Sequence, residues 1–223
     1  MFGKNKKNIF KNKGLTLIEL MVVLSIFGII SSITIFNYSK FNSSASILNL
    51  ADDIALSVRK AQGFAIGVRG SSGSFNEGYG IHFTANNNFL SEFSGSNESF
   101  ILFSDIGISP NQKYDYDNSS CGTPTDGNEC MEILSINSAD EISEIFLNDD
   151  TKSIPEKAMV DVVFRRPNPE PVFCYRLNES ENVCVQEKKI YMIRIKIASL
   201  VDPVNIYKII TISNNGQISV SLK

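Results

Sequence analysis

The sequence predicts an α+β protein. A long N-terminal helix, with a transmembrane first half and an amphipathic second half, is expected to pack on a C-terminal antiparallel β-sheet or β-sandwich domain. Three observations predict this: residues 15–36 are an apolar run, residues 47–65 place apolar side chains at helical spacing, and the chain after residue 75 alternates with a period of two. A hydrophobic content of 43% over 223 residues is enough for a buried core.

The apolar run is long enough to cross a membrane. Residues 15–36 contain one ionisable group, Glu19, and as a helix they would measure about 33 Å against a bilayer core of about 30 Å. Residues 1–14 hold five Lys and no acid, so they are expected to stay in the cytoplasm while the rest crosses. The run is longer than the apolar part of a secretory signal peptide, and a simple anchor does not require a carboxylate at this position.

The helix is expected to continue beyond the membrane. Positions 47, 48, 51, 54, 55, 58, 61, 62 and 65 are apolar apart from Gln62, and the opposite face carries Asp52, Asp53, Arg59 and Lys60. No proline occurs before Pro110, and residues 70–74 are Gly and Ser only. One helix from about 15 to 66 is therefore predicted, and its amphipathic half must pack on something.

The residues around Gly14 carry a family resemblance. The stretch Lys13-Gly14-Leu15-Thr16-Leu17-Ile18-Glu19-Leu20 resembles the leader site of type IV pilins and type II secretion pseudopilins. The resemblance implies a pilin-like fold, cleavage between Gly14 and Leu15 by prepilin peptidase, and N-methylation of Leu15 by the same peptidase/methyltransferase. It also implies an assembly role for Glu19, which would pair with the terminal ammonium of a neighbouring subunit. Leu15 stands where the family usually has Phe, and the proline found midway through many members' membrane helices is absent.

Residues 75–223 are predicted to form the globular β domain. Its strand candidates are rich in β-branched and aromatic residues. They are residues 79–83, 89–93, 99–104, 131–137, 142–148, 158–165, 172–177, 190–198, 204–212 and 217–222. Ser213-Asn214-Asn215-Gly216 predicts a hairpin turn between the last two. Residues 105–130 show no periodicity and are expected to be a long surface loop.

The arrangement is most similar to the H-type minor pseudopilins of type II secretion and the FimT-type minor pilins. Beyond the leader, this similarity includes Arg59-Lys60-Ala61-Gln62, Gly78-Tyr79-Gly80-Ile81 and the closing stretch 212–220. The insertion around 105–157 is longer than in compact members of that group.

Four cysteines follow the predicted membrane helix and are therefore expected outside the cytoplasm. Disulfides persist in that environment. Cys121 and Cys130 are nine residues apart, and Cys174 and Cys184 are ten apart. Three pairings are possible, of which we favour the two local ones. Buried free thiols are the alternative.

Other candidate sites are weaker. Asp115, Asp117, Asn118 and Asp126 could ligate calcium, but their spacing does not fit an EF-hand loop, and a solvated polar loop explains them. Basic residues near the C-terminus could bind nucleic acid, as FimT-type relatives can, although charged outward strand faces are common. They are Lys188, Lys189, Arg194, Lys196 and Lys208. No pattern predicts a metal or cofactor, and His82 lies in a strand pattern with no evident orienting partner.

These features predict a structural subunit and not an enzyme. Without the five leader Lys, 16 basic residues face 24 acidic ones, which disfavours bulk electrostatic DNA binding. The resemblance implies a single-pass protein of the bacterial inner membrane, with its β domain outside the cytoplasm, that works with other pilin subunits and an inner-membrane assembly platform. The function expected is a minor pilin or pseudopilin of a type II secretion pseudopilus or a type IV pilus. A tip subunit that binds DNA or a surface is the alternative.

Overall fold

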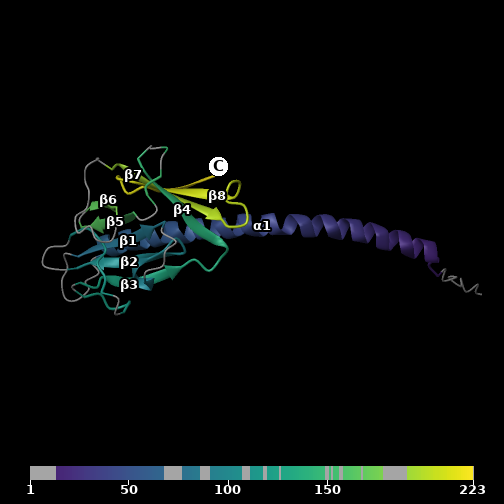
Figure 1. Cartoon of the computed structure of the whole chain (residues 1–223), viewed down its shortest axis with the longest axis horizontal. Coiled ribbons are helices and arrows are strands. Elements are labelled where there is room, and N and C mark those ends of the chain that lie inside the picture. Colours follow the sequence, from purple (N-terminus) through teal and green to yellow (C-terminus); the bar gives the residue numbers. More distant parts are fainter. Residues whose placement is uncertain are drawn as a thin grey trace, which may run out of the picture. The chain divides into compact units, whose positions relative to one another are not determined.

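The fold is described from a computed structural model (Figure 1). It describes residues 14–67, 77–85, 91–106, 111–117, 120–125, 127–148, 151, 153–155, 158–166, 168–177 and 190–222. The chain divides after Asn42 into two compact units. This boundary lies inside the long helix, and not at its end, because the amphipathic half of the helix is part of the β unit.

The long helix is α1, Leu17–Ile66. In the first unit its apolar side chains are exposed all round, with Leu17 77% and Phe27 68% exposed. The hydroxyls of Ser25, Ser32 and Thr34 donate to the carbonyls four residues earlier, at 2.8, 2.8 and 2.9 Å. These polar side chains are thus satisfied within the helix itself, as an apolar environment requires.

In the second unit the predicted apolar stripe of α1 is buried. Its core members are Ile47, Leu50, Ala51, Ile54, Ala55, Val58, Ala61 and Ala65. Leu48, which the spacing also places on this stripe, is 44% exposed. Three polar contacts fix the helix to the β domain: Ser46 donates to Asp140 at 2.6 Å, Lys60 pairs with Glu132 at 2.6 Å, and Gln62 donates to the Gly216 carbonyl at 3.4 Å.

The strands form two antiparallel sheets, as the sequence predicts. One has the order β3-β2-β1-β5-β6 and the other β4-β7-β8-β9. The strands are β1 Gly78–Thr84, β2 Ser99–Asp105, β3 Cys130–Ser135, β4 Asp140–Leu147, β5 Met159–Arg165, β6 Asn168–Arg176, β7 Met192–Ser199, β8 Tyr207–Ser213 and β9 Ile218–Leu222. One core cluster joins α1 to both sheets, with Ile54, Ile81, Val162, Ile195 and Ile210 among its buried members.

The predicted β8–β9 hairpin is present. Gly216 has φ +80°, a conformation that glycine adopts without strain. Its N–H donates to the Ser213 carbonyl at 2.9 Å, and the Ser213 N–H donates to the Gln217 carbonyl at 2.9 Å.

Two strand predictions need correction. Residues 91–93 are not a strand: Glu92–Ser94 is a 3-10 helix (η1), and the Ser91 hydroxyl oxygen caps it by accepting from the Phe93 N–H. The strand predicted from residue 204 begins only at Tyr207, because Asp202 organises residues 202–206 into a turn. In both places a side-chain cap stabilises a local turn that the period-two pattern conceals.

The segment between β2 and β3, predicted to be a surface loop, packs in part on the five-stranded sheet, and we call it the packed segment. Leu102 and Val162 face the core shared with α1, and their neighbours Phe103 and Val163 face the opposite side of the sheet. There they contact Tyr114, which is 1% exposed. The segment is irregular, as predicted, but Tyr114 and the half-buried Tyr116 and Cys121 pack on the second face of the five-stranded sheet.

Candidate processing and assembly site

The start of α1 is closed by a capping box. The Thr16 hydroxyl oxygen accepts from the Glu19 N–H at 3.3 Å. In return Glu19 Oε2 accepts from the Thr16 N–H and from the Thr16 hydroxyl, both at 2.8 Å. This reciprocal pattern satisfies amides that the first turn of a helix leaves unpaired, and a carboxylate in the first turn also complements the helix dipole.

The cap leaves Gly14 and Leu15 outside the helix. Neither residue has helical or strand structure, and Leu15 is 75% exposed. The Gly14–Leu15 peptide bond therefore lies in an open segment next to an abruptly starting apolar helix, an arrangement that a peptidase could reach without unwinding α1. Residues 1–13 of the predicted leader lie outside the described residues.

The same segment matches a known sequence motif. The prokaryotic N-terminal methylation motif matches residues 9–35. The chain has the N-terminal signature of the type IV pilin and pseudopilin class. The comparisons with curated proteins and with solved structures gave no match.

A membrane anchor agrees with this pilin-class signature. Within the part of the chain that the structure describes, α1 is the one helix long and apolar enough to span a bilayer. Leu15, Thr16 and Glu19 mark its beginning, and the sequence-predicted processing and assembly residues are therefore gathered within about one and a half helical turns.

The structure contains the predicted Cys121–Cys130 disulfide. It links the packed segment to the first residue of β3, and Cys130 is 1% exposed. Cys174 on β6 is also disulfide-bonded. Its predicted partner, Cys184, lies outside the described residues, so that pair stays a prediction.

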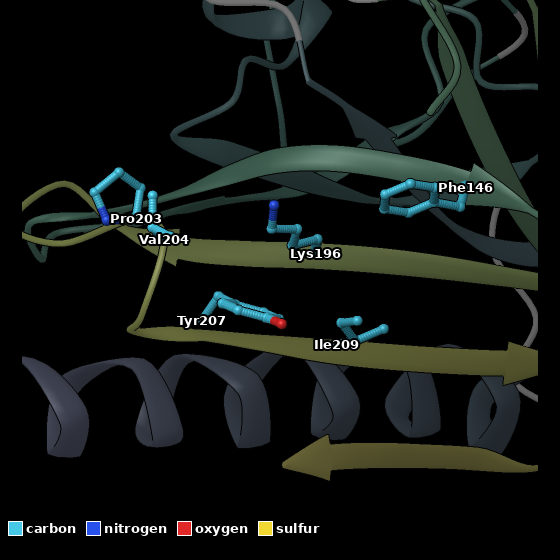
Figure 2. Close-up of a pocket in the computed structure, with 6 residues that line it drawn as sticks. All are labelled: Phe146, Lys196, Pro203, Val204, Tyr207 and Ile209. Atoms are coloured by element: carbon cyan, nitrogen blue, oxygen red, sulfur yellow. The ribbon is translucent and has the colours of Figure 1, made fainter. Parts of the chain in front are cut away.

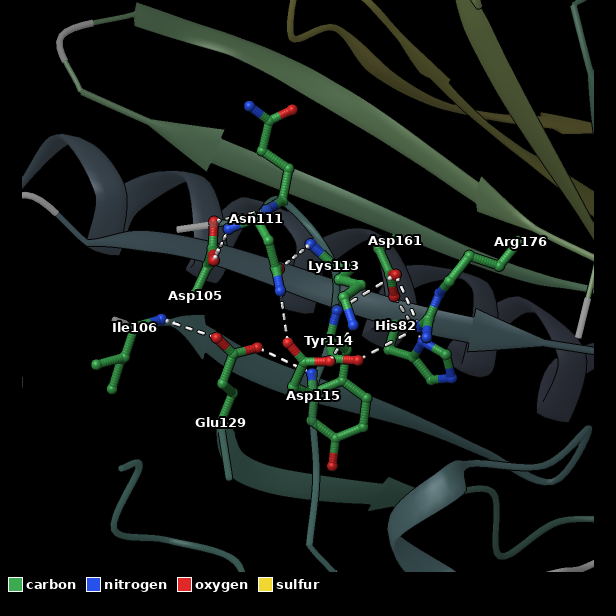
Figure 3. A network of polar contacts seen from close by, with 11 residues as sticks. His82, Asp105, Ile106, Asn111, Lys113, Tyr114, Asp115, Glu129, Asp161 and Arg176 are labelled. Carbon is green, nitrogen blue, oxygen red and sulfur yellow. Dashed lines mark hydrogen bonds and ion pairs between the residues drawn. The ribbon is translucent and has the colours of Figure 1, made fainter. Parts of the chain in front are cut away.

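A buried charge network, which the sequence does not predict, joins β1, β5 and β6 (Figure 3). His82 and Asp161 are directly opposite in the strand register, and His82 Nδ1 lies 2.6 Å from Asp161 Oδ1. Arg176 Nη2 lies 3.0 Å from Asp161 Oδ2, and the Tyr114 N–H donates to that oxygen at 3.3 Å. The expectation that His82 has no orienting partner is therefore wrong.

The second ring nitrogen of His82 also has a partner. Nε2 lies 3.1 Å from the Ser94 carbonyl oxygen, so both ring nitrogens face acceptors. Burial by itself raises the pKa of Asp161, but the nearby Arg176 and His82 hold that pKa below its usual value. His82, Asp161 and Arg176 are respectively 1%, 0% and 5% exposed.

Two further carboxyl groups fix the ends of the packed segment (Figure 3). Asp105 accepts from the Asn111 and Gln112 N–H groups at 3.0 and 3.1 Å, and Glu129 accepts from the Ile106 and Asp115 N–H groups, both at 2.9 Å. Burial raises the pKa of Asp105 to about 6 and that of Glu129 to about 9.

These carboxyl groups do not form a recognisable metal site. Across the described ranges, no group of three or more His, Cys, Asp or Glu side chains has the geometry to hold a metal ion. Of the sequence's calcium candidates, Asp115 pairs with Lys113 at 2.5 Å, while Asn118 and Asp126 lie outside those ranges.

The outer face of the four-stranded sheet has an apolar hollow of about 460 Å³ (Figure 2). It is lined by Phe146, Lys196, Pro203, Val204, Tyr207 and Ile209. Two of the basic residues considered for nucleic-acid binding have partners on this face. Lys196 pairs with Glu144 at 2.5 Å and lies over the Tyr207 ring. Arg194 lies over the Phe146 ring. Lys188 and Lys189 lie outside the described residues.

Proposed function

We propose that this chain is a structural subunit of a type IV pilus or a type II secretion pseudopilus, processed by prepilin peptidase and assembled through α1. The observation that carries the proposal is the methylation motif at a capped, apolar helix start with Glu19 in its first turn. In finer detail we propose a minor subunit of the H-type group, on the sequence similarities around residues 59–62, 78–81 and 212–220.

The geometry at Glu19 suits two simultaneous roles. Both hydrogen bonds from Thr16 end on Oε2. In the described part of the chain, Oε1 accepts no hydrogen bond. Glu19 can therefore cap its own helix with one oxygen and offer the other to the terminal ammonium of a neighbouring Leu15. In a filament, where α1 leaves the lipid, that pairing avoids an uncompensated buried carboxylate.

Processing is tested first. We expect mass spectrometry of protein from cells containing prepilin peptidase to show Leu15 as the N-methylated first residue. Gly14→Val should block cleavage, because it adds bulk beside the scissile bond. Recovery of the intact Met1 terminus from such cells would contradict the proposed processing.

Assembly is tested by two substitutions of Glu19. Glu19→Val removes both the cap and the charge, whereas Glu19→Gln keeps an oxygen that can accept from Thr16 and removes only the charge. If the carboxylate recruits a neighbour's ammonium, both variants should be inserted and cleaved, yet remain in the membrane and stay out of filaments. Filament entry by Glu19→Gln at the wild-type level would reduce the role of Glu19 to helix capping.

The buried network supports a structural and not a catalytic role. His82 and Asp161 are sealed in the sheet, and Ser94 offers His82 its backbone carbonyl and not its hydroxyl. Such an arrangement lacks an accessible nucleophile beside the base. We therefore propose that the chain is not an enzyme.

A further inference from the structure

An exposed apolar turn joins β7 to β8. Leu200 is 53% exposed, Val201 58% and Val204 77%, and Pro203 is exposed between them. Scattered exposed apolar residues are ordinary, but four within five consecutive positions form a patch that normally has a partner. Pro203 and Val204 also border the hollow on the outer face of the sheet (Figure 2).

The turn holds this shape through Asp202, the single charged residue within it. Asp202 Oδ1 accepts from the Asn205 N–H at 3.2 Å and from its side-chain amide at 3.0 Å, and Oδ2 lies 3.1 Å from the same amide nitrogen. The Asp202 carbonyl accepts from the Ile206 N–H at 2.9 Å. The carboxylate is thus engaged by its own turn, and the surface that remains is apolar.

The strand register places this turn at one definite end of the β unit. Ser199, the last residue of β7, is opposite Asp140, the first residue of β4, and the Leu200 N–H donates to the Ala139 carbonyl at 2.9 Å. Asp140 in turn accepts from the Ser46 hydroxyl at 2.6 Å. The turn therefore belongs to the end of the sheet that is fixed to the beginning of the helix segment in this unit.

That helix segment directly follows the membrane span. Tyr38 and Phe41 are 68% and 73% exposed, with the exposed Lys40 between them. Aromatic and Lys side chains of this kind concentrate at membrane interfaces. Ser46 follows Phe41 by five residues and Tyr38 by eight in the sequence.

We propose that the Leu200–Val204 turn rests on the outer interface of the membrane in which α1 is anchored, and holds the β unit against the lipid before assembly. Shallow burial of apolar side chains at the headgroup boundary is an established way to bind a bilayer surface. Lipid is favoured as the occupant because the turn lies at the Ser46 end of the β unit, where the chain enters this unit from the span, and presents no uncompensated charge. The inference depends on anchoring by α1 and not on filament assembly.

The chain has no tryptophan, so one introduced residue reports its own environment. The probe is Val204→Trp in the full chain, reconstituted in phosphatidylcholine vesicles with or without brominated acyl chains. The matched control is Asn215→Trp, at an exposed position in the hairpin turn at the opposite end of β8. We expect blue-shifted emission and loss of intensity in brominated lipid at position 204, and neither at 215.

Tryptophan itself favours interfaces, so the native side chains are tested separately. Leu200→Ser and Val201→Ser are added to Val204→Trp, so that two apolar side chains are removed from the contact. The quenching should then report a ratio of lipid-bound turn to water-exposed turn that is lower by about tenfold or more.

Two results would overturn the proposal. One is water-like emission at position 204 in vesicles that retain the chain. The other is a blue shift that brominated lipid does not quench and that disappears when the chain is diluted with excess lipid, which would assign the turn to a contact between subunits.

Discussion

Gly80 in β1 shows how tightly single residues are constrained in the five-stranded sheet. A Cβ at this position would lie 2.6 Å from the Phe103 ring and 2.8 Å from the Val162 carbonyl oxygen. Phe103 is fully buried beneath the packed segment, so it has little space into which to move. The absence of a side chain at Gly80 therefore makes room for the Phe103 ring.

We expect Gly80→Ala to lower the free energy of unfolding by about 1–3 kcal/mol through overpacking. Gly63→Ala is the matched control, since Gly63 lies in α1 with no atom within 4 Å of the added Cβ, and it should raise stability by about 0.5–1 kcal/mol. Urea unfolding of both variants measures the difference. Equal effects would mean that contact with Phe103 is unimportant.

The buried charges are also residue-scale constraints. Arg176→Met should cost about 3–5 kcal/mol, because it leaves Asp161 charged and without its guanidinium. Lys60→Met, which breaks the exposed pair with Glu132, should cost no more than about 1 kcal/mol. Chemical unfolding compares the two. A small loss for Arg176→Met would show that His82 alone compensates Asp161.

At the scale of elements, the segment between β2 and β3 is irregular yet specific. Tyr114 packs against Phe103 and Val163, while Asp105 and Glu129 each accept two backbone N–H groups near the ends of the segment. Hydrogen bonds to two buried carboxyl groups take the place of a regular ladder, which makes this layer dependent on pH.

Stability should fall as pH rises above about 4. The pKa values of Asp105 and Glu129 are raised by folding, to about 6 and about 9. Their contributions to stability are complete below the pKa values of the unfolded chain, and they are lost as pH rises through the pKa values of the folded chain. Asp161, with a lowered pKa, acts in the opposite sense: its contribution is present above its unfolded value and is lost at lower pH.

Thermal unfolding between pH 3 and 10 checks this profile. Glu129→Gln should flatten the decrease of stability with rising pH between about pH 6 and 9. Asp105→Asn should flatten the same decrease between about pH 4 and 6. An unchanged slope in both variants would remove these carboxyl groups as its cause.

The Cys121–Cys130 disulfide also fixes the segment between β2 and β3 to the sheet. Replacing Cys121 and Cys130 together by Ser should lower stability by about 2.5–3 kcal/mol, on the chain-entropy model for a loop of this length. Non-reducing peptide mapping should recover Cys121–Cys130 and Cys174–Cys184. Four alkylatable thiols, or crossed pairs, would contradict the local pairing.

At the scale of the whole molecule, one helix serves two environments. Its first part has apolar side chains on every side, and the hydroxyls of Ser25, Ser32 and Thr34 donate within the helix. Its second part packs in the core with both sheets. Removing the first part should therefore leave the fold of residues 43–223 intact while abolishing membrane retention. Far-UV circular dichroism and membrane fractionation of the truncated chain measure the two effects.

The sequence alone determined the features that depend on local order. The apolar run and its preceding Lys residues predict the anchor, helical spacing predicts the buried face of α1, and the stretch around Gly14 predicts the pilin-class signature that the motif match supports. Period-two alternation likewise predicts the antiparallel strands. These signals are contained within a few turns or one strand, so neighbouring residues suffice to specify them.

The tertiary structure alone decided which distant residues meet. His82 and Asp161 are 79 positions apart and become partners only through the β1–β5 register. Tyr114 is buried because it packs on the faces of β2 and β5 that point away from the helix. The division of the described strands into two sheets, and the position of the Leu200–Val204 turn at the Ser46 end, have the same origin. Such features depend on strand order and register, which are set by the packing of the whole core and leave no periodic trace in the sequence.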